Sequence, residues 1–124
     1  DKLVTFNIDK FKIGLAICFD LRFPELFREY FNRGVDIIAL PSSFTSRTGK
    51  LHWEVLVRAR AIENYCYVLA PNQYGLDGNG LETYGHSMIV NPLGQIIDEL
   101  HNQQEGIILH DIFPSSQKHL PTID

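Results

Sequence analysis

Residues 12–25 read KIGLAICFDLRFPE, and this stretch decides the predicted fold. An apolar, β-prone segment runs to Cys18, and Pro24 then suits the first turn of a helix. A strand followed by a turn and a helix places Cys18 at the carboxyl edge of a sheet, where α/β proteins form their ligand sites. The sequence therefore predicts a candidate nucleophile at Cys18, although a free cysteine is often only a small buried hydrophobe.

The residue after Cys18 adds a second chemical group. Phe19 follows the strand end directly, so its backbone N–H is suited to donate to an oxyanion that forms on an attacked carbonyl. The same order of strand, nucleophile and helix presents the serine of other hydrolases. The Phe19 N–H is therefore the predicted oxyanion donor.

Strands and helices alternate on both sides of this stretch. Apolar, β-prone segments occupy residues 3–8, 12–18, 35–40 and 65–71, and helical patterns occupy residues 23–33 and 52–64. The segment at 35–40 is apolar almost throughout, which is typical of a strand buried on both faces of a parallel sheet. With a polar loop at residues 42–50, this order predicts a parallel β-α-β-α-β unit.

The pattern changes after residue 71. Residues 74–84 are rich in glycine and polar side chains and predict a loop. Strands are expected at residues 87–90 and 95–100, around a turn with Pro92 and Gly94, and a last strand is expected at residues 105–111. These short strands predict an antiparallel meander, so the whole chain is predicted to be a layered α/β structure.

Two charged residues follow the predicted nucleophile. Asp20 and Arg22 come directly after a buried strand, where an unpaired charge is costly. They are expected to pair with each other or to cap the helix at Pro24, which gives them a supporting role in the site. The alternative is that Arg22 orients a substrate carboxylate through a bidentate contact.

Further candidates follow the strand at 35–40. We expect Ser42, Ser43 and Phe44 to line a pocket at the carboxyl edge, with helix capping as the alternative. His52 and Glu54 begin the predicted second helix, where an acidic side chain also favours the helix dipole. Both are therefore candidates for the site or for helix stability.

The remaining reactive or charged side chains are expected to have structural roles. Arg58 and Arg60 are expected to form ion pairs with Glu63 on one helix, His86 to bond the backbone, and Cys66 to lie in the core. Cys18, His52 and His86 lack the spacing of a metal site, so no metal is expected.

Composition excludes several other classes of function. The 124 residues are 44% hydrophobic and 21% charged, with a net charge of −4. A mildly acidic chain without a basic block is not typical of a protein that binds nucleic acid or an anionic membrane, and no run reaches the ~20 apolar residues of a membrane span. Two cysteines in different contexts do not form a disulfide framework, which favours a reducing compartment and predicts a cytoplasmic protein.

The quoted stretch also resembles a known family. CFDLRFPE, at residues 18–25, is similar to the catalytic-cysteine motif of the nitrilase superfamily, Cys-x-Asp-x-Arg-aromatic-Pro-Glu. The resemblance continues through LPSSFTSRTGKLHWEVLVRARAIENYCYVLAPNQYG at residues 40–75 and YGHSMIVNPLGQII at residues 84–97. It looks closest to the Nit branch, whose members are deaminated-glutathione amidases or omega-amidases, and the block around TG-x-x-HWE favours the first.

The resemblance implies a four-layer α-β-β-α sandwich and a catalytic set of Glu, Lys and Cys. Only the cysteine can be carried over, onto Cys18, because the family's Glu and Lys precede it, and Lys10 and Lys12 lie too close to Cys18 to match that Lys. The 124 residues are therefore expected to be the C-terminal part of a single carbon–nitrogen hydrolase domain without its N-terminal part. The implied reaction is amide hydrolysis through a cysteine thioester, with release of ammonia and a carboxylic acid and without a cofactor.

Several alternatives stay open at this point. The chemistry of the superfamily also includes N-carbamoyl amine and nitrile hydrolysis. A chain without the Glu base and the Lys is alternatively an inactive fragment or remnant, and this chain alone is expected to be inactive. A Cys–His hydrolase that uses His52 or His86 has no local sequence signature.

The expected partners are a small-molecule amide and a second copy of the protein. A helix at residues 23–33 carries more aromatic surface than one sheet face readily covers, and the family's dimers pack helices from this region. The predicted homodimer or higher homo-oligomer rests on this surface, which consists of Phe23, Phe27, Tyr30 and Phe31.

Overall fold

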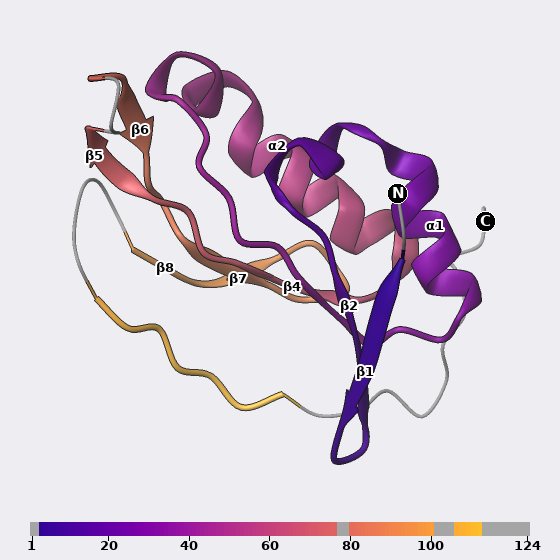
Figure 1. The fold of residues 1–124 in the computed structure, drawn as a ribbon. Coiled ribbons are helices and arrows are strands. Elements are labelled where there is room, and N and C mark those ends of the chain that lie inside the picture. Colours follow the sequence, from indigo (N-terminus) through magenta and orange to yellow (C-terminus); the bar gives the residue numbers. More distant parts are fainter. Residues whose placement is uncertain (1–2, 77–79, 101–105, 113–124) are drawn as a thin grey trace.

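The part of the chain that the structure describes forms a six-stranded sheet with two α-helices on one face (Figure 1). The computed structural model describes residues 3–76, 80–100 and 106–112. The sheet has the order β1-β2-β3-β4-β7-β8, and a two-stranded sheet of β5 and β6 lies beside it. The strands are β1 (Val4–Ile8), β2 (Phe11–Leu15), β3 (Ile37–Ala39), β4 (Tyr67–Ala70), β5 (Tyr74–Leu76), β6 (Glu82–Tyr84), β7 (Met88–Val90) and β8 (Ile96–Glu99). The helices are the 3₁₀ turn η1 (Cys18–Arg22), α1 (Pro24–Asn32) and α2 (Ser46–Asn64).

The centre of the sheet is parallel. Ile13 of β2 pairs with Ile37 of β3, and Ile37 pairs in turn with Tyr67 of β4. Helices α1 and α2 are the two crossovers between these strands, and both lie on the same face of the sheet (Figure 1). The predicted parallel β-α-β-α-β unit is therefore confirmed.

Antiparallel strands flank this centre. β1 pairs with β2, while β7 pairs with β4 and β8 pairs with β7. Asn91 shapes the turn between β7 and β8, because its side-chain oxygen accepts hydrogen bonds from the backbone N–H groups of Leu93 (3.0 Å) and Gln95 (2.9 Å). The expected antiparallel pair around Pro92 and Gly94 is thus present.

Three segments differ from the predictions. Helix α2 begins at Ser46, so most of the loop expected at residues 42–50 is helical. The loop expected at 74–84 contains the antiparallel pair β5 and β6, with residues 77–79 outside the described part of the chain. Residues 106–111 of the last expected strand form no strand, and residue 105 also lies outside the described ranges.

Contacts between distant segments explain the early start of α2. Gly49, in its first turns, lies so close to β6 that a Cβ atom there would be 2.5 Å from Cβ of Tyr84. Ser46 also donates a hydrogen bond of 2.8 Å to the Glu82 carboxylate. The glycine and polar residues at 46–50 have a low helix propensity and locally predict a loop. Packing against β6 outweighs this weak preference.

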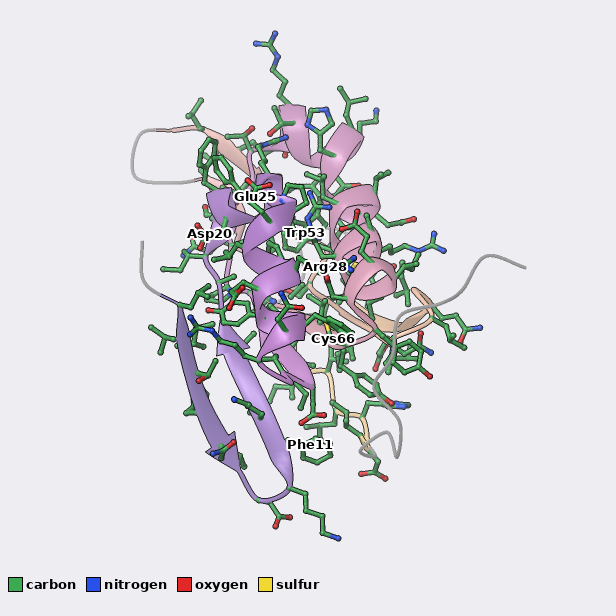
Figure 2. All side chains as sticks on the ribbon, turned by 90° about the vertical axis from the view of Figure 1, so that its right-hand side faces the viewer. Phe11, Asp20, Glu25, Arg28, Trp53 and Cys66 are labelled. Carbon is green, nitrogen blue, oxygen red and sulfur yellow. The ribbon has the colours of Figure 1, made fainter. Side chains whose placement is uncertain are left out.

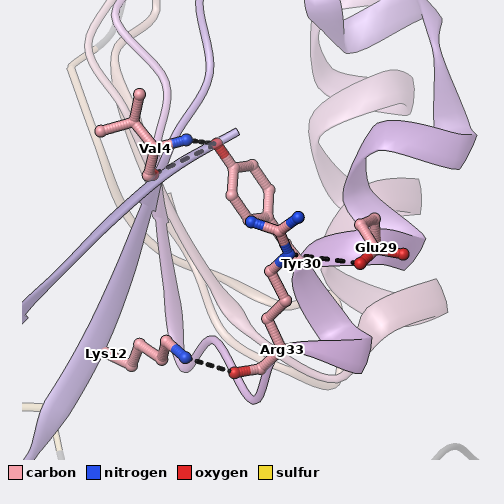
Figure 3. A network of polar contacts seen from close by, with 5 residues as sticks. All are labelled: Val4, Lys12, Glu29, Tyr30 and Arg33. Carbon is pink, nitrogen blue, oxygen red and sulfur yellow. Dashed lines mark hydrogen bonds and ion pairs between the residues drawn. The ribbon is translucent and has the colours of Figure 1, made fainter. Parts of the chain in front are cut away.

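The core fills the space between the sheet and the two helices. Trp53, Tyr30, Phe27 and Leu21 are its largest fully buried side chains from the helical side. Tyr30 lies over Gly14 of β2, and its hydroxyl donates to the Leu15 carbonyl. The same hydroxyl accepts a hydrogen bond of 3.2 Å from the Val4 N–H (Figure 3). Lys12 of β2 also donates a hydrogen bond of 2.7 Å from its Nζ to the carbonyl of Arg33, the residue that follows α1 (Figure 3).

This packing reduces the aromatic surface on which the predicted dimer rests. Phe27 and Tyr30 are each 1% exposed, so two of the four rings belong to the core of the chain. Phe23 is exposed and Phe31 is half-buried. The homodimer stays a prediction, with a smaller aromatic surface than the sequence indicated.

The opposite face of the sheet is also apolar. Because Gly14 faces Tyr30, its neighbours on β2 and their partners on β1 point away from the helices. Val4, Phe6 and Ile8 are exposed there by 47%, 41% and 55%. Residues 106–112 run along this side in Figure 1. An apolar sheet face of this kind is what a further layer covers in a sandwich.

Substitution of Gly49 tests the contact that starts α2. An exposed helix glycine gains stability when replaced by alanine. Gly49→Ala should instead lower the free energy of unfolding by about 1–3 kcal/mol, because the new methyl group overpacks Tyr84. Denaturant unfolding measures this change, with the exposed neighbour Lys50→Ala as a control that should stay within about 0.5 kcal/mol. A stabilised Gly49→Ala protein would contradict the packing described here.

Candidate active site

The carboxyl ends of the three parallel strands meet at one edge of the sheet. The pairing continues past the strands, because the Cys18 N–H donates to the Pro41 carbonyl (3.1 Å) and the Ser42 N–H to the Pro71 carbonyl (2.9 Å). Residues that follow β2, β3 and β4 are thereby held side by side. This edge is where the sequence predicted the site.

A cavity of about 450 Å³ opens at this edge. Its size lies within the range of small-molecule sites. The lining residues come from three strand ends and from the segment before β7, and they are Ile17, Cys18, Pro41, Ser42, Ser43, Pro71, Asn72, Gln73 and Ser87. The structure therefore brings together Cys18, Ser42 and Ser43 of the predicted residues.

Cys18 has an unusual backbone conformation. Its φ is +35°, whereas Ile17 before it is extended, with φ −131° and ψ 126°. A positive φ in a residue with a Cβ atom costs about 1–3 kcal/mol and persists only where the surroundings impose it. The thiol is half-buried and belongs to the cavity lining. The strand thus ends in a strained turn that presents the sulfur to the cavity.

Asp20 stabilises this turn. Its carboxylate accepts a hydrogen bond of 2.8 Å from the Ile17 N–H, and its own N–H donates to the Ile17 carbonyl at 2.7 Å. Asp20 therefore caps η1 rather than the helix at Pro24. It does not line the cavity, and its contacts agree with a supporting role.

Arg22 closes the other end of the turn. Its Nη2 lies 3.2 Å from Nδ1 of His52 on α2, and its guanidinium stands over the Phe44 ring, 5.4 Å from the ring centre. Arginine only donates hydrogen bonds, so Nδ1 of His52 is the acceptor in this contact. Arg22 and Asp20 form no ion pair within the described part of the chain, in contrast to one of the two expectations.

Glu54 lies away from the cavity. Its carboxylate is exposed and pairs with Arg58 on the same helix at 3.4 Å. Since α2 begins at Ser46, Glu54 is also beyond the first helical turn, and the expected interaction with the helix N-terminus is wrong. Phe44 and His52 are likewise absent from the lining, and both contact Arg22.

Asn72 is a site residue that the sequence reasoning missed. Its side chain accepts from the Phe44 N–H (3.0 Å) and donates to the Gly85 carbonyl (2.7 Å), while its backbone N–H donates to the Ser87 hydroxyl (2.8 Å). One buried amide thus connects the segments after β3, after β4 and before β7. The position of Asn72 directly after a strand, like that of Ser42, was the available signal.

The oxyanion donor predicted at Phe19 keeps its N–H at the start of η1. Within residues 3–76, 80–100 and 106–112 no acceptor is recorded for this group, as is usual in the first turn of a helix. The Phe19 side chain is 65% exposed and meets the Phe23 ring edge-on. The role of the Phe19 N–H stays a prediction.

Cys66 and His86 have structural surroundings. Cys66 is buried in the core, where burial, with the nearby Asp36 charge, raises the pKa of its thiol to about 12 (Figure 2). His86 stacks on Tyr84, with ring centres 4.0 Å apart, and its Nδ1 lies 2.9 Å from the Tyr84 carbonyl. Neither residue lines the cavity.

The described residues offer neither a cluster of metal ligands nor a membrane-spanning helix. No three His, Cys, Asp or Glu side chains there gather in a group able to hold a metal ion. None of the helices found there is long and apolar enough to cross a membrane.

Comparisons with known proteins agree with the motif at Cys18. The family described as "Carbon-nitrogen hydrolase" matches residues 1–120. A "Deaminated glutathione amidase" of Synechocystis sp. is 44% identical over 115 residues, which are 92% of this chain and 42% of the relative. The chain therefore spans about two fifths of the length of this curated relative.

Solved structures show the same fold. Nit3 of Saccharomyces cerevisiae, a member of branch 10 of the nitrilase superfamily, matches with a TM-score of 0.79 and 36% identity, over 85% of this chain and 39% of that one. A mutant amidase from Nesterenkonia sp. AN1 matches with a TM-score of 0.75 and 28% identity, over 83% and 38%. That structure shows covalent addition of the acetamide moiety of fluoroacetamide at its active-site cysteine. The predicted resemblance to the Nit branch and the predicted fold class are confirmed.

Substitution of Asp20 tests whether its carboxylate caps η1. Asp20→Ala removes the acceptor of the Ile17 N–H and should lower the free energy of unfolding by about 0.5–2 kcal/mol. Asp20→Asn keeps an acceptor oxygen and should retain most of this stability. Thermal unfolding of both variants measures the difference, and equal melting temperatures for wild type and Asp20→Ala would refute the capping role.

Proposed function

The chain belongs to the carbon–nitrogen hydrolase family, and on that premise we propose that the intact protein hydrolyses a non-peptide amide through a thioester on Cys18. The observation that carries the proposal is the position of Cys18. It ends a buried strand in a strained turn and opens onto a cavity of small-molecule size. The active-site cysteine named for the Nesterenkonia amidase supports the same choice.

The proposed reaction has two halves. The Cys18 thiolate attacks the amide carbon, a carbon–sulfur bond forms, and the carbonyl electron pair moves onto oxygen. When the carbonyl re-forms, the carbon–nitrogen bond breaks and the nitrogen leaves as ammonia after taking the proton of the thiol. Water then attacks the thioester, which releases the carboxylic acid and restores the thiol. The N–H of Phe19 is the proposed donor to the oxyanion in both halves.

The polar lining of the cavity supports a small amide as substrate. Ser42, Ser43 and Ser87 contribute hydroxyl groups, and Asn72 and Gln73 contribute side-chain amides. Groups of this kind are suited to hydrogen-bond a carbonyl and an amide nitrogen. By analogy with the Synechocystis relative, we propose an amide of the deaminated-glutathione type rather than a nitrile or an N-carbamoyl amine.

The proposed general base lies outside this cavity lining. The nine lining residues, all within the described part of the chain, include no carboxylate and no lysine. The thiolate rather than the thiol is the nucleophile, so a base must accept the proton. We propose that the Glu and the Lys implied by the family resemblance come from residues beyond these 124. A cytoplasmic homodimer of the intact protein stays a proposal that rests on sequence alone.

Replacement of the proposed nucleophile gives the primary test. In the full-length protein, Cys18→Ala should lower kcat for ammonia release from small amides by about 10⁴-fold or more. Cys66→Ala is the control and should keep kcat within about threefold, because Cys66 lies in the core and away from the cavity. Activity retained by folded Cys18→Ala protein would refute the mechanism.

A second test concerns the base. Residues 1–124 expressed alone should show no measurable turnover of a glutamine-like or succinamate-like amide, because a thiol without a positioned base reacts slowly. The full-length protein serves as the positive control. Turnover by the short chain within tenfold of the long one, abolished by Glu54→Gln, would mean that this part supplies its own base. The exposed pairing of Glu54 with Arg58 argues against that outcome.

A further inference from the structure

Arg60 is a buried cation with a contact outside its own helix. It is 6% exposed, and its Nε donates a hydrogen bond of 3.0 Å to the carbonyl of Leu21, 39 residues earlier in the chain. Its Nη1 pairs with Glu63 at 3.1 Å, and its guanidinium stands 5.8 Å from the centre of the Phe27 ring. The sequence predicted only the pairing with Glu63.

The Leu21 carbonyl belongs to the turn that begins at Cys18. Helix η1 covers Cys18–Arg22, so Arg60 holds a carbonyl three residues after the cysteine. The last carbonyl groups of a helix have no partner inside it, and η1 is only one short turn. The Arg60 guanidinium, on α2, therefore supplies the hydrogen-bond donor that the Leu21 carbonyl lacks within η1.

The strained conformation of Cys18 explains why such support matters. A positive φ at a residue with a Cβ atom, such as Cys18, persists only where the surrounding structure imposes it. Upstream, the Cys18 N–H bonds the Pro41 carbonyl. Downstream, Leu21 is fully buried and bonds Arg60, and Arg22 contacts His52. Both downstream contacts come from α2, so this helix holds the far end of the turn.

Arg58 provides an internal comparison on the same helix. Its Nε also donates to a loop carbonyl, that of Gly94 at 2.7 Å, and its Nη1 also pairs with a glutamate, Glu54 at 3.4 Å. The Arg58 contacts lead to the β7–β8 turn and not to η1. The Arg58 side chain is 45% exposed, whereas that of Arg60 is 7% exposed. Burial of a cation is costly and is compensated only by well-placed partners.

We infer that Arg60 is a positioning residue for the active site. Its guanidinium fixes the Leu21 carbonyl, and through the rigid turn η1 it fixes the backbone and sulfur of Cys18 relative to the cavity. The inference rests on the proposed function in one respect, because it takes Cys18 as the nucleophile. Small displacements of a reacting group lower the rate of the chemical step more than the affinity for substrate.

The test compares Arg60→Met with Arg58→Met in the full-length protein. Arg60→Met should lower kcat by about 100-fold, while KM changes less than about threefold. The rate of Cys18 alkylation by iodoacetamide, followed on the tryptic peptide of residues 13–22, should fall by at least about tenfold. Arg58→Met should leave kcat and alkylation unchanged, even where both variants lower the melting temperature.

The outcomes separate the inference from the proposed function. Unchanged kcat and unchanged Cys18 alkylation in folded Arg60→Met protein would overturn the inference. Where Arg60→Met does not fold, Arg60→Lys, with Arg58→Lys as control, is judged by the same measurements, because lysine keeps the charge and loses the planar fork. If Cys18→Ala retains amidase activity, the proposed function fails, and alkylation still tests the positioning of Cys18.

Discussion

The site depends on one backbone hydrogen bond, which the Cys18 N–H donates to the Pro41 carbonyl. It extends the parallel pairing of β2 and β3 by one step, to the residue where the chain turns away from the sheet. The cysteine therefore adopts a positive φ between a fixed strand and a fixed turn. The Asp20 cap and the contacts that α2 makes with Leu21 and Arg22 support this arrangement.

Local patterns in the sequence predicted most of the fold and the place of Cys18 at the end of a strand. The apolar run at 35–40 and the proline at position 24 each depend on neighbours a few residues away, so the strand and the helix were predictable. The start of α2 was not, because it depends on Gly49 packing against Tyr84, 35 residues later in the chain. The role of Asn72 and the contact of Arg60 with Leu21 were missed for the same reason, since the partners lie on distant segments.

The architecture separates the chemistry of the site from its support. The cavity lining holds one thiol and a set of hydroxyl and amide groups, whereas the charged residues Asp20, Arg22 and Arg60 lie outside it. Asp20 and Arg60 hydrogen-bond the backbone of the turn, and Arg22 contacts the His52 side chain. This arrangement keeps ion pairs out of the described lining. The amidases to which the chain is similar have the same fold, and the chain spans about two fifths of their length.

Direct observation of the acyl-enzyme tests the central claim most closely. The full-length protein is quenched in acid during turnover of a succinamate-like amide, digested with trypsin and analysed by mass spectrometry. We expect the acyl group on the peptide of residues 13–22, which contains Cys18 and not Cys66. An acyl group found only on the peptide with Cys66, or on no cysteine while ammonia is released, would contradict a thioester at Cys18.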